Sequence, residues 1–167
     1  NGMIENAIRN TRGQFRTLRS CIQERLGKLV PLDHPLIAWM LEHTSTVRCA
    51  MVRGDDGTTP WQKARGRAFA MEAIGFAEKC HFKLPMKGPH KERRGNMTDQ
   101  WEDGTFLGYS WTSNEYVYAN PDGVHTARAV TRRPISERWM VDDVANLKAT
   151  PESKHQPRGQ GHGLQPN

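Results

Sequence analysis

Lys79-Cys80-His81-Phe82-Lys83-Leu84 is the stretch at which the periodicity of the chain changes. Apolar residues alternate there with lysine and histidine, which predicts a strand with one buried face and one wet face. Three further strands are predicted downstream, over residues 104–110, 116–120 and 124–132. Asn114 and the Asn-Pro-Asp-Gly sequence at 120–123 are typical of the hairpin turns between them. The second half of the chain is therefore predicted to form a small, barrel-like β module.

The residues before this stretch follow a helical period instead. Apolar side chains recur at steps of three and four over residues 2–26 and again over 34–51, which predicts two packing helices. Thr59 and Pro60 predict the start of a short third helix, and Gly66 predicts its end. The predicted fold class is α+β. The predicted parts are a helical part over 1–70, a β module over 71–134, a short helical segment over 135–149 and a disordered tail over 150–167.

The composition favours a polyanionic partner. Lysine and arginine number 24 against 18 aspartates and glutamates, so the formal net charge is +6, and such chains attract the phosphates of nucleic acids. Three widely spaced cysteines do not suggest a disulfide framework. No apolar run approaches the roughly 20 residues that a membrane helix needs. We therefore expect a nuclear or cytoplasmic protein with no membrane partner.

The first predicted helix carries one acid and four basic residues on a single face. At about 100° per residue, four arginines lie within about 40° of Glu5 around the helix axis. They are Arg9, Arg12, Arg16 and Arg19. One interpretation is a solvated face on which Glu5 pairs with Arg9, which stabilises a helix by about 0.2–0.5 kcal/mol. The other is phosphate binding, because neighbouring arginines repel one another unless an anion lies across them.

Several short motifs follow one another along the chain. They are Asn-Gly-Met-Ile-Glu-Asn at 1–6, Gly-Thr-Thr-Pro-Trp-Gln at 57–62 with Gly-Arg at 66–67, Gly-Phe-Ala-Glu-Lys-Cys at 75–80, Thr-Phe-Leu-Gly-Tyr-Ser at 105–110 with Tyr116 and Arg128, and Arg-Arg-Pro at 132–134. In this order they resemble the integrases of copia-type retrotransposons. The resemblance extends over about residues 1–148, from the last catalytic helix through the module that follows the catalytic core.

The resemblance implies the end of an RNase H-like catalytic core followed by an SH3-like β module. In such enzymes two aspartates and one glutamate hold two divalent ions, for which carboxylates and Mg²⁺ are well suited. Glu5 matches the glutamate, as a catalytic and metal-binding residue, while Arg9 and Arg12 match positions that contact DNA. The two aspartates are expected upstream, so we expect this chain alone to be inactive. A homo-oligomer is implied for the intact integrase.

A second basic surface is predicted on the β module. Its candidate DNA-binding residues are Lys79, Lys83, Arg128 and Arg132, joined by Arg133 and by Lys87, Lys91, Arg93 and Arg94 of a predicted loop. The aromatic residues of the module are interpreted as its core, and stacking on unpaired bases is the alternative.

Two other functions and a zinc site are weighed against the integrase interpretation. A non-catalytic nucleic-acid-binding or assembly module derived from such an element would use the same basic surfaces. A helix-turn-helix regulator fits less well, because the segment between the first two helices is long and contains proline. A zinc site also fits less well, because adjacent Cys80 and His81 point to opposite faces of a strand.

Overall fold

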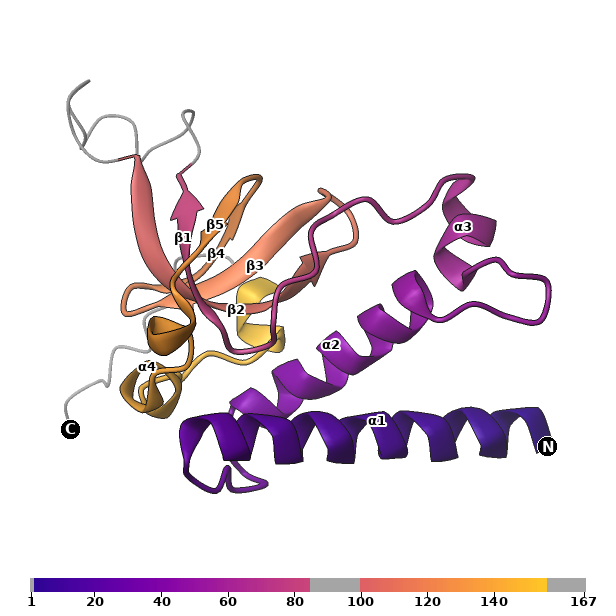
Figure 1. Cartoon of the computed structure of the whole chain (residues 1–167), viewed down its shortest axis with the longest axis horizontal. Helices are drawn as coiled ribbons and strands as arrows, with labels where there is room; N and C mark the ends of the chain where they lie inside the picture. Colours follow the sequence, from indigo (N-terminus) through magenta and orange to yellow (C-terminus); the bar gives the residue numbers. More distant parts are fainter. Residues whose placement is uncertain (1, 85–99, 156–167) are drawn as a thin grey trace, which may run out of the picture.

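Helices precede an antiparallel sheet in a mixed α and β fold, which confirms the predicted α+β class (Figure 1). The structure, a computed structural model, describes residues 2–84 and 100–155. The α-helices are α1 (Gly2–Leu26), α2 (Leu36–Met51), α3 (Pro60–Arg65) and α4 (Val141–Ala145). The strands are β1 (Lys79–Lys83), β2 (Trp101–Ser110), β3 (Glu115–Asn120), β4 (Gly123–Ala127) and β5 (Val130–Arg132). Short 3-10 helices lie at η1 (Ile135–Glu137) and η2 (Glu152–His155).

The three N-terminal helices begin and end close to where the sequence predicts. Thr59 Oγ1 accepts the Gln62 N–H at 3.1 Å, and Gln62 Oε1 accepts the Thr59 N–H at 2.9 Å, which completes a capping box at the start of α3. Gly66 ends α3 with a left-handed φ of 67°. These signals act within one turn of the chain, so local sequence is sufficient to place them.

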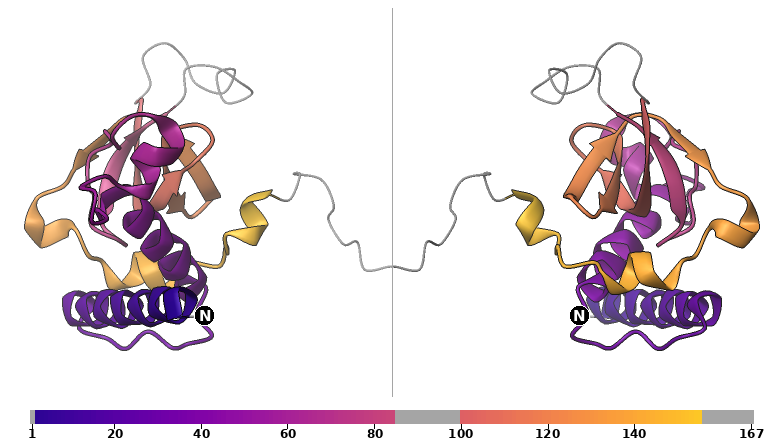
Figure 2. Two further views of the ribbon diagram at one scale, coloured as in Figure 1. Left: turned by 90° about the vertical axis from the view of Figure 1, so that its right-hand side faces the viewer. Right: turned by 90° about the vertical axis from the view of Figure 1, so that its left-hand side faces the viewer.

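The single strand predicted over 124–132 is two strands, and this prediction was wrong. β4 pairs with β3, whereas β5 pairs with β1 at the opposite edge of the sheet, whose order is β4-β3-β2-β1-β5. Three residue steps from Ala127 to Val130 span at most about 11 Å, whereas the edges of a flat five-stranded sheet lie about 19 Å apart. The sheet must therefore curl, and Figure 2 shows its strands inclined to one another rather than lying in one plane.

A bulge in β2 helps to fill the curled sheet with aromatic rings. The register with β3 shifts between Phe106 and Gly108, so Phe106 and Tyr109 reach the same face although they are three residues apart. The cluster inside the sheet, called the inner cluster here, comprises Ile74, Cys80, Phe82, Phe106, Tyr109, Tyr116, Tyr118 and Ala127. Its centre is the stacked pair of Phe82 and Tyr118, with ring centroids 4.1 Å apart. The predicted aromatic core is confirmed at Phe106, Tyr109, Tyr116 and Tyr118, whereas Trp101 is 40% exposed and lies outside it.

A second cluster joins the helices to the outer face of the sheet. Its buried members are Ile22, Leu26, Val30, Leu36, Trp39, Met40, Phe76, Ala77, Leu107, Val117, Ala119, Val144 and Leu147. We call it the helix–sheet cluster, and Figure 1 shows α2 lying between α1 and the sheet. Trp39 Nε1 also donates to the Ala149 carbonyl at 2.8 Å, which ties α2 to the segment after α4. The predicted helical part and β module thus share one core across residue 70.

The C-terminal segment is partly helical. Within the predicted segment over 135–149, η1 and α4 occupy short stretches, and η2 lies at the start of the predicted tail. The remainder of that tail, 156–167, and the predicted basic loop with Lys87, Lys91, Arg93 and Arg94 lie outside the described residues. Among the helices that are described, none combines the length and apolarity that a membrane span requires.

Candidate nucleic-acid interface

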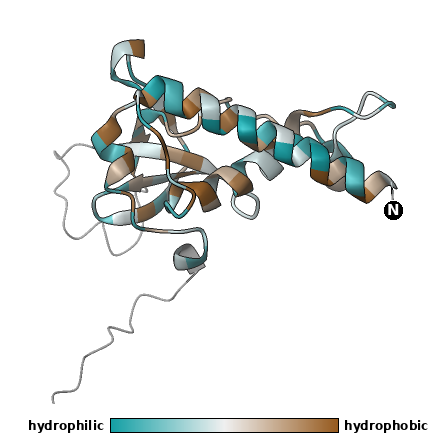
Figure 3. Ribbon diagram, turned by 90° about the horizontal axis from the view of Figure 1, so that it is seen from below, coloured by the Kyte–Doolittle hydropathy of each residue, from teal (hydrophilic) through white to brown (hydrophobic). Residues whose placement is uncertain are grey.

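The N-terminal half of α1 is a bare helix. Residues 2–10 are all exposed, and the apolar Met3, Ile4 and Ile8 expose 90%, 65% and 46% of their surfaces. The C-terminal half packs instead on the helix–sheet cluster, where Ile22 and Leu26 are buried. Figure 3 shows polar and apolar bands alternating along α1, which lies in front in that view. The free surface of α1 is therefore concentrated in its N-terminal half.

Three arginines of the predicted row remain free. Arg9, Arg12 and Arg16 are exposed, and none of them takes part in the ion pairs of the described residues. A rise of about 1.5 Å per residue separates successive members by about 4.5 and 6 Å along the axis. Glu5 is exposed too and forms no ion pair with Arg9 in this part of the chain. The described part of the chain therefore does not contain the Glu5–Arg9 ion pair that the first interpretation of this helix face assumed.

Arg19, the fourth member of the row, is used inside the fold. Its Nη2 and Nε donate to the Val30 carbonyl at 2.6 and 3.3 Å. Gln23, one turn further on, accepts the Val30 N–H on its Oε1 at 3.1 Å. Val30 exposes only 4% of its surface, so these side chains satisfy backbone groups that water does not reach. The free part of the row therefore ends at Arg16.

Arg19→Met is expected to lower the free energy of unfolding by about 1–3 kcal/mol, because the buried Val30 carbonyl loses a charged donor. Arg16→Met is the matched control, since Arg16 is exposed on the same helix. Denaturant titration of both variants measures the difference. Equal losses in the two variants would contradict the structural role of Arg19.

The candidate residues of the β module do not share one surface. Lys79 and Lys83 lie on the wet face of β1, as predicted from the alternation, and Lys79 pairs with Asp143 at 2.9 Å. Arg132 is paired in register with Cys80 of the inner cluster, so its side chain lies on the same face as Cys80. That face is opposite to the one that carries Lys79 and Lys83. Arg128 is 84% exposed and lies 3.2 Å from Glu115. DNA contact by these four residues stays a prediction.

Arg132 belongs to a buried charge network that the sequence analysis missed. At its centre is Glu78, which is 0% exposed. Its carboxylate accepts hydrogen bonds from Arg132 Nε at 2.7 Å, from Arg132 Nη2 at 2.8 Å and from the Gly75 N–H at 3.2 Å. Arg138 Nε lies 3.3 Å from the same carboxylate. The network fastens the end of β5 to the start of β1.

Glu78 had a signal in the sequence. It precedes Cys80 and Phe82 at a period of two, which places it on the buried face of the predicted strand. Burial, followed by the negative charge of Glu78, raises the pKa of the Cys80 thiol to about 12. Cys80 is therefore a packing residue rather than a nucleophile.

The described residues do not by themselves fit a divalent metal ion. No group of three or more histidine, cysteine, aspartate or glutamate side chains is arranged there to hold one. Glu5 is an exposed carboxylate on a bare helix, and a pair of Mg²⁺ ions requires several oxygen ligands.

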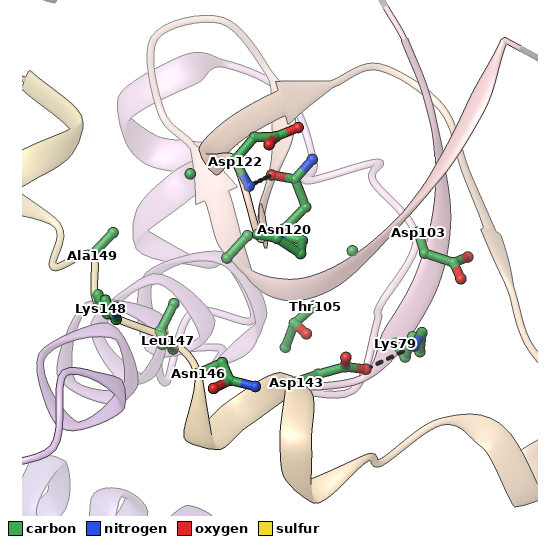
Figure 4. Close-up of a pocket in the computed structure, with 14 residues that line it drawn as sticks. Lys79, Asp103, Thr105, Asn120, Asp122, Asp143, Asn146, Leu147, Lys148 and Ala149 are labelled. Atoms are coloured by element: carbon green, nitrogen blue, oxygen red, sulfur yellow. Dashed lines mark hydrogen bonds and ion pairs between the residues drawn. The ribbon is translucent and has the colours of Figure 1, made fainter.

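A cavity of about 530 Å³ lies between the β3–β4 hairpin and the segment that follows α4 (Figure 4). Lys79 and Asp143 pair across one side of it at 2.9 Å. Asp103, also in its wall, accepts from Arg133 at 2.6 Å and lies 2.9 Å from His81 Nδ1. Because these charged groups already bind one another, the cavity is a weaker candidate site than α1.

Neither a family model, nor a curated protein, nor a solved structure matches the chain. What points to function is therefore the residues themselves. Among them, the free arginines of α1 form the clearest group with unused binding capacity.

Proposed function

We propose that the chain is a DNA-binding part of a copia-type retrotransposon integrase, in which Arg9, Arg12 and Arg16 of α1 contact the DNA backbone. The observation that carries this proposal is the row of free arginines on the exposed side of α1, which begins in the bare N-terminal half of the helix. Three guanidinium groups held this close repel one another. A phosphate chain removes that repulsion and releases its own counterions, which favours binding. The order of the sequence motifs supports the family.

The proposed contact is with phosphates rather than with bases. The basic residues follow one side of α1, and Met3, Ile4 and Ile8 expose apolar surface around them, with Ile8 one turn before Arg12. Reading bases in a groove requires side chains that pair with base edges, whereas contact with a phosphate strand requires only positive charge along one side of the helix. Arginine contacts with phosphates fix position and carry no base information. Binding is therefore expected to be independent of sequence and sensitive to salt.

The curled sheet supports the assignment of the β module as SH3-like. Its five antiparallel strands, the bulge in β2 and the short link from β4 to β5 curl the open sheet in the direction that a small barrel requires. We propose further that α1 and α2 are the last helices of an RNase H-like core. In the intact integrase, Glu5 is the proposed third carboxylate. Mg²⁺ held with two aspartates would supply positive charge at the reacting oxygens.

The remaining parts of the proposal follow from the family. The intact integrase is proposed to act as a homo-oligomer in the nucleus or cytoplasm. A non-catalytic nucleic-acid-binding or assembly module is the second candidate, and the core shared by helices and sheet favours it, because the chain has a packed body of its own. If the parent reading frame continues upstream into two aspartates within an RNase H-like strand pattern, the enzyme interpretation is correct. A reading frame that begins near Asn1 would leave only the binding module.

The double reversal Arg9→Glu/Arg12→Glu is expected to abolish most of the salt-dependent binding. Three phosphate contacts predict that log K falls with log salt at a slope of about −2.7, since each contact contributes about −0.9. Two reversals leave one contact and should flatten the slope to about −0.9 or less in magnitude. The measurement is a fluorescence-anisotropy titration of a labelled duplex at about 50 and about 200 mM salt.

Arg53→Glu/Arg67→Glu is the matched control, because it changes the net charge by the same amount at two exposed arginines outside α1. This control should keep most of the wild-type slope. Equal flattening in both double variants would mean diffuse charge attraction and would defeat the proposal. No binding by the wild-type chain would defeat it as well.

A further inference from the structure

His43 is buried where α2 meets the sheet. Its side chain belongs to α2 and only 7% of the residue is exposed. Three aromatic rings surround it, with centroids 4.9 Å away at Phe76, 5.8 Å at Phe106 and 6.1 Å at Tyr109. Phe76 precedes β1, and the other two rings come from β2, so His43 lies in the contact through which α2 and the sheet are held together.

The surroundings of His43 suit a neutral ring. Its Nδ1 is buried and has no hydrogen-bond partner among the described residues. The titratable group that faces it from β2 is Tyr109, whose hydroxyl donates to the Glu72 carbonyl at 3.0 Å and accepts the Ile74 N–H at 3.2 Å. Tyr116 of β3 lies beyond Tyr109, at a centroid distance of 5.8 Å. No carboxylate of the described chain contacts the ring, so a proton on it would have no counter-charge.

We propose that His43 makes the contact between α2 and the sheet acid-sensitive, so that protonation of its ring releases α2 while the inner cluster stays packed. The two clusters make this separation physically reasonable. The helix–sheet cluster depends on α2 through Leu36, Trp39 and Met40, whereas the inner cluster draws its buried members from the sheet and the segment before it. Release of α2 therefore removes the helix–sheet cluster. It also uncovers one side of the Phe106 and Tyr109 rings, while the other contacts of the inner cluster stay within the sheet.

The direction of the effect follows from the ring's burial. Desolvation lowers the pKa of His43 to about 4, whereas a released ring has an ordinary pKa near 6.5. The contact holds the neutral form, so its stability is complete above about pH 6.5 and is lost as the pH falls toward about 4. Between about pH 7 and about pH 5, the equilibrium for release of α2 should rise about 20-fold.

Hydrogen exchange of backbone amides tests the proposal on the full chain. After correction for intrinsic exchange, protection of α2 amides should fall about 20-fold between about pH 7 and about pH 5, and protection in β2 and β3 should change far less. His43→Phe should remove the pH dependence, because it keeps an apolar ring in the cage. His34→Asn, at a partly exposed histidine before α2, should retain it.

Three results would overturn the proposal. One is a parallel fall in wild-type and His43→Phe protein, and another is an equal fall in the sheet and in α2. The third comes from the wild-type chain alone and does not require the variant to fold. A ring titration of His43 followed by nuclear magnetic resonance should have its midpoint well below the ordinary value, and a midpoint near about 6.5 would refute the mechanism.

Discussion

Glu78→Ala is expected to lower the free energy of unfolding by about 3–5 kcal/mol, because it leaves buried positive charge without a partner. The carboxylate is fully buried and is the counter-charge for two guanidinium groups. Arg132 and Arg138 expose only 32% and 20% of their side chains, so water replaces the lost carboxylate poorly. The substitution also removes the acceptor of the Gly75 N–H. The link between β1 and β5 is therefore expected to weaken first.

A double-mutant cycle measures this network directly. Urea unfolding of Glu78→Ala, Arg132→Ala and the double variant should give a coupling energy above about 1 kcal/mol. Arg128→Ala is the control, because Arg128 is also paired with a glutamate but is 84% exposed, and exposed pairs contribute little. A loss below about 1 kcal/mol for Glu78→Ala would mean that the arginines regain water at almost no cost.

Gly104→Ala is expected to destabilise the chain by about 1–3 kcal/mol through overpacking. A Cβ atom at this position would overlap the Tyr118 ring and lie 3.1 Å from the Ala119 carbonyl oxygen. The ring has little room to move away, because it stacks on Phe82 and its hydroxyl donates to Glu102 Oε1. The added methyl group is therefore expected to strain the packing of the inner cluster and so to lower the free energy of unfolding.

Gly13→Ala provides a control of opposite sign. A Cβ atom at Gly13 has nothing within 4 Å, and alanine in a helix interior is favoured over glycine by about 0.5–1 kcal/mol. Thermal unfolding of the two variants should therefore shift the midpoint in opposite directions. A stabilising or neutral Gly104→Ala would show that the stacked Tyr118 ring can be displaced easily.

The elements that sequence analysis placed well are those whose signals are local. The capping box at Thr59 and Gln62 fixes the start of α3 within four residues, and the alternation around Phe82 identifies β1 and its buried face. The division of 124–132 into β4 and β5 has no comparable signal. It depends on which distant strand each segment meets, and that choice follows from the curl of the whole sheet.

The candidate site shows the same division. Helical periodicity places Arg9, Arg12 and Arg16 on one face, and the structure leaves them free. Helical periodicity does not reveal that Arg19 binds the Val30 carbonyl. That carbonyl lies in a loop eleven residues further along the chain, and the need for a donor there is not visible in the helix pattern. The partner of Arg132 is 54 residues away in the chain, so only the buried-face position of Glu78 hinted at it. Local patterns therefore found the charges but not their internal partners.

The bare half of α1 ties the recognition of a polyanion to a helix–coil equilibrium. Residues 2–10 are all exposed, so packing supports this end of α1 little, and its helix depends mainly on local propensity. Arg9 lies in this stretch, so a ligand that requires all three arginines in a row must also hold this end of the helix in place, and the ordering cost reduces the observed affinity. Asn10 and Gly13 are both poor helix formers. Asn10 and Gly13 touch no phosphate in the proposed complex, yet they are expected to lower the affinity for the ligand by weakening the helix.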